Sequence, residues 1–198
     1  MVLGAIAAGN CVVIKPSHNG YNFGTFLATV LPTYLDPECY PIFFEKNDRV
    51  EKLLEEKFDY IYFTGSTSIG RMIHRAANKY LTPTTLQLGG KNPIYIDSSA
   101  DLEQAAARII WGKCLNSGQA CSCPDYVLCS KPVRERFVEH AKSAIERFYP
   151  DSQHCPIVND HQLQRLSNLL KGLDIALGGG VDFTQRTMQP TVAVNVSP

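Results

Sequence analysis

The chain has 198 residues, of which 44% are hydrophobic and 19% are charged, as in an ordinary soluble globular protein. Its 19 basic and 19 acidic side chains balance, which argues against nucleic acid or an anionic membrane as a partner. No apolar run is long enough to cross a bilayer, and the apolar residues 1–9 lack the basic leader of a signal peptide. These features predict a cytoplasmic protein.

The first half of the chain alternates between short β-branched runs and segments with helical spacing of apolar residues. Apolar side chains at Phe23, Phe26, Leu27 and Val30, for example, fall on one face of a helix. In chain order the patterns predict a strand at 11–14, a helix at 21–31, a strand at 39–44, a helix at 48–57, a strand at 59–63, a helix at 71–80 and a strand at 84–88.

The second half continues the same alternation, and Asp101 stands where a helix N-terminus is expected. The patterns predict a strand at 92–97, a helix at 101–113, a strand at 125–129, helices at 132–148 and 160–171, and a strand at 191–196. Strands that alternate with helices of this length indicate an α/β fold with parallel, doubly wound sheets. A boundary near Gly89-Gly90 would separate a cofactor domain, residues 1–89, from a domain that presents a thiol, residues 90–198.

The seven cysteines are odd in number and irregularly spaced, so we interpret them as reduced thiols rather than a disulfide framework. A zinc site from Cys121, Cys123 and Cys129 is the alternative. No paired C-x-x-C motif or matching histidine spacing supports it, and no metal is predicted.

Residues 63–70 combine the end of a strand, a glycine-containing turn and the start of a helix. Gly65 would let the backbone approach a phosphate, and the Ser66 hydroxyl could donate to it at the helix N-terminus. An ordinary strand-to-helix turn with Ser66 as the cap is the competing interpretation. Lys15 follows a buried strand and could reach a ribose or phosphate, although a solvated lysine at a strand end is the more common reason for such a residue.

Two further segments carry polar or reactive side chains. Gln87 lies between leucines ahead of Gly89-Gly90, so it would face a different side of its strand from Leu88. Cys121 follows the turn at 116–120 and precedes a strand, which would place its thiol on a loop. For a lone cysteine, burial as a small apolar side chain is the common alternative.

Four motifs in this order resemble the aldehyde dehydrogenase family. They are Ala-Ala-Gly-Asn-Cys-Val-Val-Ile-Lys-Pro-Ser, Phe-Thr-Gly-Ser-Thr-x-x-Gly, Leu-x-Leu-Gly-Gly-Lys-Asn-Pro and Gly-Gln-x-Cys. Tyr-Leu-Thr-Pro-Thr-Thr and Pro-Asp-Tyr-Val-Leu-Cys look most like its class 3 branch, which handles aliphatic and aromatic aldehydes. The resemblance implies NAD- or NADP-dependent oxidation of aldehydes to carboxylic acids and a homodimer for a full-length relative.

The resemblance also implies a role for each matching residue. Cys121 would be the nucleophile that forms a thiohemiacetal and then a thioester with the aldehyde carbon. Lys15 would hold the adenosine ribose, Leu88 would contact the nicotinamide end, and the turn residues Gly65, Ser66 and Gly70 would sit at the pyrophosphate.

Four departures from the family pattern bear on activity. Gln87 occupies the position of the family's general-base glutamate. His18 occupies the position of a glutamate that binds the ribose, and the loss of that negative charge makes NADP no worse a cofactor than NAD. Glu45 and Lys46 replace a glycine pair, and residues 151–158 look shorter than in the family. Family elements that flank this region, including an oxyanion-hole asparagine and a Glu-x-Phe-Gly-Pro element, would lie before Met1 and beyond Pro198, so both domains are expected to be incomplete.

These departures leave three functional hypotheses. The first is an NAD(P)-dependent aldehyde dehydrogenase. The second is a catalytically impaired fragment or pseudoenzyme that pairs with intact relatives. The third is an acyl-transfer variant that passes the thioester to another thiol, a reaction that does not need the missing carboxylate.

Overall fold

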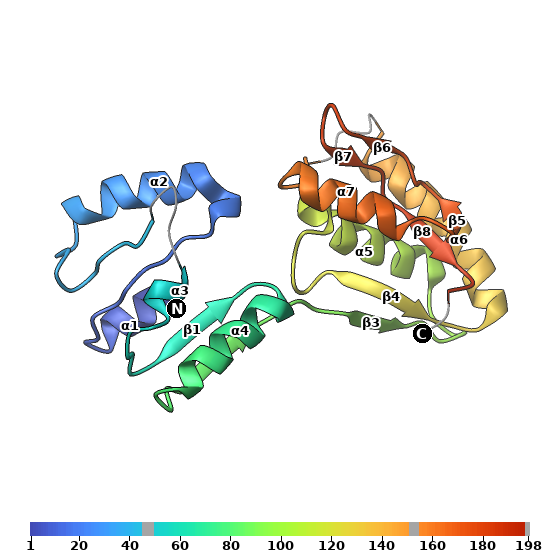
Figure 1. Cartoon of the computed structure of the whole chain (residues 1–198). Coiled ribbons are helices and arrows are strands. Elements are labelled where there is room, and N and C mark those ends of the chain that lie inside the picture. Colours follow the sequence, from blue (N-terminus) through green and yellow to red (C-terminus); the bar gives the residue numbers. More distant parts are fainter. Residues whose placement is uncertain (45–49, 151–154, 197–198) are drawn as a thin grey trace. The chain divides into compact units, whose positions relative to one another are not determined.

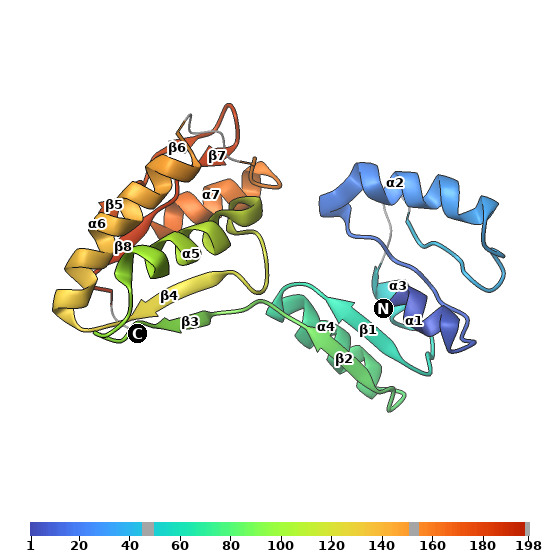
Figure 2. The same ribbon diagram turned by 180° about the vertical axis from the view of Figure 1, so that it is seen from behind.

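The computed structural model describes residues 1–44, 50–150 and 155–196. The chain folds as two compact units, Met1–Gly89 and Gly90–Pro198, which Figures 1 and 2 show from opposite sides. Helices and strands alternate within each unit, so the predicted α/β class is confirmed. None of the helices in the described part of the chain combines the length and apolar character needed to cross a membrane.

The first unit contains a strand, a helix and a second strand that pack together. Strand β1 (Ile61–Thr64) pairs in parallel with β2 (Thr84–Gln87), and helix α4 (Thr67–Asn78) covers the pair through its buried residues Ile73 and Ala77. The helix begins four residues before the predicted start at Arg71. The reason is local, because the Ser66 hydroxyl accepts a hydrogen bond from the Ile69 N–H at 3.4 Å and caps the helix there.

The predicted strands at 11–14 and 39–44 are reduced to a single parallel bridge between Ile14 and Ile42. The Val12 N–H still donates to the Cys39 carbonyl oxygen at 2.9 Å. In a regular parallel ladder the Val12 carbonyl oxygen would in turn accept a hydrogen bond from the N–H of residue 41. Residue 41 is a proline and has no N–H, so a regular ladder cannot form.

The remaining helices of the first unit differ from the prediction in detail. Helix α2 (Tyr21–Val30) ends one residue before the predicted Leu31 and is flanked by the 3₁₀ turns η1 (His18–Gly20) and η2 (Leu31–Thr33). Leu27 and Val30 are half-buried, whereas Phe23 and Phe26 are exposed. A short helix α1 (Val2–Ala7) was not predicted. The predicted helix at 48–57 appears among the described residues as α3 (Val50–Leu53), which ends before the predicted Lys57. Its predicted start at 48–49 and the side chains at 45–46 lie outside the described residues.

The second unit is built around two parallel strands and two long helices. Strand β3 (Asn92–Tyr95) pairs with β4 (Pro124–Leu128), and helices α5 (Leu102–Cys114) and α6 (Lys131–Phe148) pack on each other. The predicted cap is present, since an Asp101 carboxylate oxygen accepts from the Gln104 N–H at 3.1 Å. The core consists of buried apolar side chains from these elements: Ile96, Leu102, Ala106, Ile110, Val133, Phe137, Ala141 and Ala144.

The C-terminal part of the second unit contains antiparallel pairs that the sequence did not predict. Helix α7 (Asp160–Leu169) is followed by β5 (Asp174–Leu177), which pairs antiparallel with β8 (Val192–Val194). Between them, β6 (Val181–Asp182) pairs with β7 (Thr187–Met188). Gly178 and Gly179 have φ values of 74° and 93°, a conformation in which a side chain is strained, and they let the chain turn back after β5.

Candidate functional site

The loop that carries Cys121 has an unusual backbone. In the 3₁₀ turn η3 (Leu115–Gly118), Asn116, Ser117 and Gly118 take φ values of 52°, 54° and 74° in succession. Left-handed geometry costs a residue with a side chain roughly 1–2 kcal/mol, so it persists only where surrounding contacts hold it. Strain of this kind is often found at functional sites.

Side-chain hydrogen bonds hold this loop against the segment 155–158. The Gln119 amide donates to the Pro156 carbonyl oxygen at 3.2 Å and accepts from the Val158 N–H at 2.9 Å. The Ser117 hydroxyl donates to the Cys155 carbonyl oxygen at 2.6 Å. The glutamine of the Gly-Gln-x-Cys motif therefore fixes the loop, a role that sequence reasoning did not assign.

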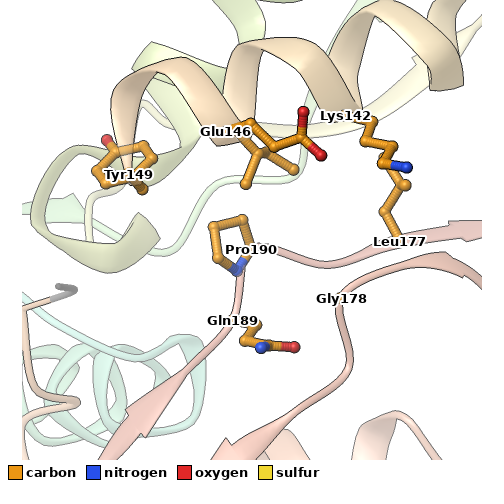
Figure 3. Close-up of a pocket in the computed structure, with 8 residues that line it drawn as sticks. Lys142, Glu146, Tyr149, Leu177, Gly178, Gln189 and Pro190 are labelled. Atoms are coloured by element: carbon orange, nitrogen blue, oxygen red, sulfur yellow. The ribbon is translucent and has the colours of Figure 1, made fainter. Parts of the chain in front are cut away.

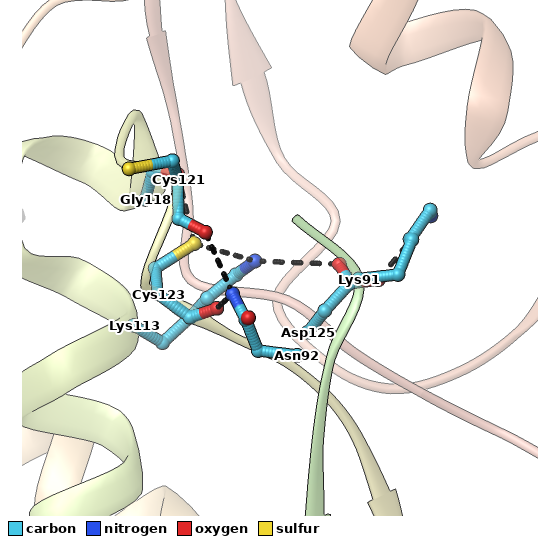
Figure 4. Close-up of polar contacts among 7 residues, drawn as sticks. All are labelled: Lys91, Asn92, Lys113, Gly118, Cys121, Cys123 and Asp125. Atoms are coloured by element: carbon cyan, nitrogen blue, oxygen red, sulfur yellow. Dashed lines mark hydrogen bonds and ion pairs between the residues drawn. The ribbon is translucent and has the colours of Figure 1, made fainter. Parts of the chain in front are cut away.

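The start of β3 holds the loop from its other side (Figure 4). The Asn92 amide nitrogen donates to the carbonyl oxygens of Cys121 and Cys123, both at 2.8 Å. At Gly90, a Cβ atom would overlap the Cys121 carbonyl oxygen, so only glycine permits this approach. Gly90 and Asn92 were visible in the sequence as part of a motif, but their contact with the Cys121 loop depends on the parallel pairing of β3 and β4.

The Cys121 thiol is exposed, and in Figure 4 its sulfur points away from the cluster of polar side chains around Asn92. Within residues 1–44, 50–150 and 155–196, its backbone N–H meets no hydrogen-bond acceptor. A thiol with an open N–H beside it can attack a carbonyl carbon and stabilise the oxygen that becomes negative.

The neighbouring Cys123 is in a different environment. Its thiol donates to the Gly118 carbonyl oxygen at 3.1 Å, and the Lys113 ammonium lies 3.7 Å from its sulfur. Asp125 shares that ammonium at 3.8 Å and a second one, Lys91, at 3.2 Å. These ion pairs are largely exposed, so screening by water limits their contribution.

Three other thiols are held in their protonated form. Burial raises the pKa of Cys114 and of Cys129. The adjacent Cys11 thiol raises the pKa of Cys39, by hydrogen bonding first and by charge second. Because the thiolate is the nucleophile, these shifts make the three side chains less reactive near neutral pH.

We expect Cys121 to be the first of the seven cysteines to react when the native chain is treated with limiting iodoacetamide. Its thiol is exposed on a loop with left-handed backbone geometry, whereas raised pKa values protect Cys39, Cys114 and Cys129, and Cys123 is hydrogen-bonded to a carbonyl. Cys11 and Cys155 are also exposed, and they are the competitors that the mapping must separate from Cys121. Peptide mapping after a short pulse measures the order of labelling. Unfolding in urea is the control, since it should remove the preference. Labelling of Cys123 ahead of Cys121 would contradict the assignment.

The remaining candidate residues belong to the first unit, and five of them come together at the ends of β1 and β2. The Gly65 N–H donates to the Gln87 carbonyl oxygen at 3.0 Å. Gly70 is buried, and a Cβ atom there would approach the Leu88 side chain to 2.6 Å. Ser66 caps α4, and the exposed Gln87 ends β2 beside this turn. No acidic side chain occupies the first turn of α4, so its N-terminus is compatible with an anion.

Lys15 and His18 follow the bridge at Ile14. The half-buried Lys15 donates through its ammonium group to the Pro16 carbonyl oxygen at 3.1 Å. The exposed His18 ring stacks on the Phe44 ring, with centroids 5.0 Å apart and an interplanar angle of 24°. Cys121 belongs to the second unit and the other candidates to the first.

A hollow of about 230 Å³ lies in the second unit between α6 and the chain around β5 and β7 (Figure 3). Lys142 and Glu146, one helical turn apart on α6, line one side, and Gln189 and Pro190 face them. None of the predicted site residues lies there.

The structure gives no support to the zinc alternative. Among the residues that it describes, which include Cys121, Cys123 and Cys129, no three histidine, cysteine or carboxylate side chains are grouped to hold a metal ion.

Known proteins resemble the chain along its whole length. The sequence model of the aldehyde dehydrogenase family matches residues 1–198. Over 98% of the chain, identity is 44% with dimeric NADP-preferring aldehyde dehydrogenase from Canis lupus familiaris and 46% with human aldehyde dehydrogenase family 3 member B1. The chain spans 44% and 43% of the length of these relatives.

Solved structures show the same likeness. The substrate-bound AldH of Staphylococcus aureus superposes with a TM-score of 0.93 at 32% identity, covering 99% of this chain and 44% of that one. A Mycobacterium tuberculosis aldehyde dehydrogenase complexed with NAD+ superposes with a TM-score of 0.79 at 25% identity, covering 93% of this chain and 42% of that one.

Proposed function

Because the chain belongs to the aldehyde dehydrogenase family, we propose that it takes part in the NAD- or NADP-dependent oxidation of aldehydes to carboxylic acids, with Cys121 as the nucleophile. The observation that carries this proposal is the exposed Cys121 thiol on a loop held by Asn92 and Gln119, beside a backbone N–H that meets no acceptor among the described residues. The chain spans less than half the length of its relatives, so the proposal concerns a protein that includes these residues.

The chemistry of Cys121 follows from its surroundings. Its thiolate adds to the aldehyde carbon, and the Cys121 N–H donates to the oxygen that becomes negative. Loss of hydride from the same carbon leaves a thioester on the sulfur. Because Asn92 and Gln119 hold the loop, this N–H does not need to reorganise as the charge develops.

The residues at the ends of β1 and β2 fit a dinucleotide. Gly65 and Ser66 lie at the N-terminus of α4, where N–H groups and the helix dipole favour a pyrophosphate. Gly70 lies beneath Leu88 and allows close packing between α4 and the strand, while Leu88 would face the nicotinamide end. When bound, the nicotinamide supplies the hydride acceptor.

The ribose end of the site would include Lys15 and His18. Lys15 follows Ile14, at the carboxyl end of a strand segment where open α/β folds bind ligands. A histidine at position 18 carries no negative charge to repel a 2′-phosphate, so both NAD and NADP are accepted. The name of the Canis relative, dimeric NADP-preferring, is in keeping with this and supports a homodimer for the whole protein.

In this proposal the two units have different roles. Met1–Gly89 supplies the dinucleotide-binding residues, and Gly90–Pro198 supplies the nucleophile. The substrate would be an aliphatic or aromatic aldehyde, as expected for the class 3 branch, and the protein would act in the cytoplasm.

A second candidate function rests on Gln87. This exposed side chain ends β2 and is an amide where the family pattern has a carboxylate. An amide cannot take a proton from water at neutral pH, so the thioester on Cys121 would persist. A persistent thioester favours transfer of the acyl group to an external thiol, or leaves the protein catalytically impaired.

The proposal is tested by trapping the thioester. In a full-length protein that carries residues 1–198, an aldehyde and NADP should add one acyl group to Cys121, detected by intact mass and peptide mapping. Cys121→Ala should remove the adduct, and Cys123→Ala, a matched change two residues away, should retain it. An adduct on Cys123, or none in the presence of bound NADP, would show that Cys121 is not the nucleophile.

A further inference from the structure

Two cysteines outside the proposed catalytic site lie opposite each other in the first unit. Ile14 and Ile42 form a parallel bridge, and three residues earlier on each segment stand Cys11 and Cys39. The same register extends to this point, because the Val12 N–H donates to the Cys39 carbonyl oxygen at 2.9 Å.

The geometry of this pair is compatible with a disulfide bond. Residues in register on adjacent parallel segments project their side chains to the same side, and such segments lie about 4.8 Å apart. Disulfides need Cα atoms roughly 4.4–6.8 Å apart. The two side chains lie close enough to influence each other, since the Cys11 thiol raises the pKa of Cys39.

Both sulfur atoms are accessible to a small oxidant. Cys11 is exposed and Cys39 is only partly buried. The nearby Cys11 thiol and the Asp36 carboxylate both raise the pKa of Cys39, which favours the more exposed Cys11 as the sulfur that meets the oxidant. The pair therefore has an accessible sulfur and a second thiol opposite it.

We propose that Cys11 and Cys39 are a redox-sensitive pair that forms a reversible disulfide when the protein meets a hydroperoxide. The Cys11 sulfur attacks the peroxide, the O–O bond breaks, and Cys11 becomes a sulfenic acid while the peroxide is reduced to water or an alcohol. The Cys39 sulfur then attacks the Cys11 sulfur. The S–S bond forms, the S–O bond breaks, and the departing hydroxide and the Cys39 proton leave as water. A dithiol reductant reverses the reaction.

This proposal does not depend on the proposed function, because neither cysteine belongs to the catalytic loop. Its consequence is local. The disulfide would close a loop that contains η1, α2 and η2, and it would restrict the segment that leads directly to Lys15.

The experiment uses the 198-residue chain, treated with a several-fold molar excess of hydrogen peroxide so that oxidation of the exposed Cys121 does not consume the oxidant, blocked with iodoacetamide and mapped without reduction. Cleavage after Glu38, the first glutamate in the chain, places Cys11 and Cys39 on separate peptides. We expect these two peptides to appear joined, with the loss of two hydrogen atoms, and dithiothreitol should separate them.

Three variants complete the test. Cys11→Ser and Cys39→Ser should each abolish the joined peptides, whereas Cys129→Ser, which removes a thiol from the second unit, should leave them unchanged. The proposal is overturned if Cys11 and Cys39 are recovered fully alkylated while another cysteine is oxidised, or if either is joined to a different cysteine. Joined peptides that occur only in disulfide-linked dimers would also overturn it, because the geometry places both sulfurs in one chain.

Discussion

Replacing Gln87 with glutamate should turn a protein that stalls as an acyl-enzyme into one that turns over steadily, with a gain of about 10²–10⁴ in the steady rate. Attack by the Cys121 thiolate and loss of hydride need no base at position 87. Hydrolysis of the thioester does need an activated water, and an amide cannot accept its proton. The position of Gln87, exposed at the end of β2, leaves room for this change without disturbing the core.

The measurement compares the burst and steady phases of NADPH formation by stopped-flow absorbance. A full-length protein carrying residues 1–198 should give one fast burst and then stall, with acylated Cys121 seen by intact mass. Gln87→Glu should leave the burst size nearly unchanged and add a steady phase. Thr85→Glu, another exposed position on β2, is the matched control and should still stall. Rapid steady turnover with Gln87 in place would mean that another residue activates the water.

Replacing Phe137 with alanine should lower the free energy of unfolding of the second unit by about 3–5 kcal/mol. The Phe137 side chain is 5% exposed and lies in the core that α5 and α6 share. Truncation removes a buried ring and leaves a cavity that close-packed neighbours cannot refill. Phe183→Ala is the control, since that ring is 52% exposed and should change stability little.

Urea unfolding followed by tryptophan fluorescence measures this effect in the intended unit. The chain has a single tryptophan, Trp111, which lies on α5 next to the buried Ile110 in the sequence and is itself 58% exposed. The tryptophan fluorescence therefore reports the unfolding of the second unit alone. The unfolding of the first unit does not contribute to the measured transition. A loss below about 1 kcal/mol for Phe137→Ala would contradict the packing of α6 described here.

Local patterns were sufficient to predict the main helices and the parallel strands. Helix α5 begins after Asp101 as predicted, because its cap is a side chain that contacts its own backbone. Helix α6 buries Phe137, Ala141 and Ala144, as its 3.6-residue spacing indicates. The family, and Cys121 as its candidate nucleophile, could likewise be predicted from short motifs.

Features that depend on partners distant in the chain could not be predicted in this way. The strands at 11–14 and 39–44 shrink to one bridge because the Val12 carbonyl would need an N–H from Pro41, a pairing that neither segment reveals alone. Strand β5 was not predicted because a run of four residues ahead of Gly178 is too short to show a clear strand pattern, and it becomes a strand only through its pairing with β8.

By itself, the sequence determined the α/β class, the family, and which thiol is the candidate nucleophile, because spacing and motif are local properties of the chain. Only the tertiary structure decided what holds that thiol in place. Asn92 reaches the Cys121 loop from 29 residues away, through the pairing of β3 with β4. Gln119 lies in the loop and bonds to Val158, 39 residues further along the chain. A hydrogen bond between such distant residues exists only after both segments have folded, so no local pattern could reveal it.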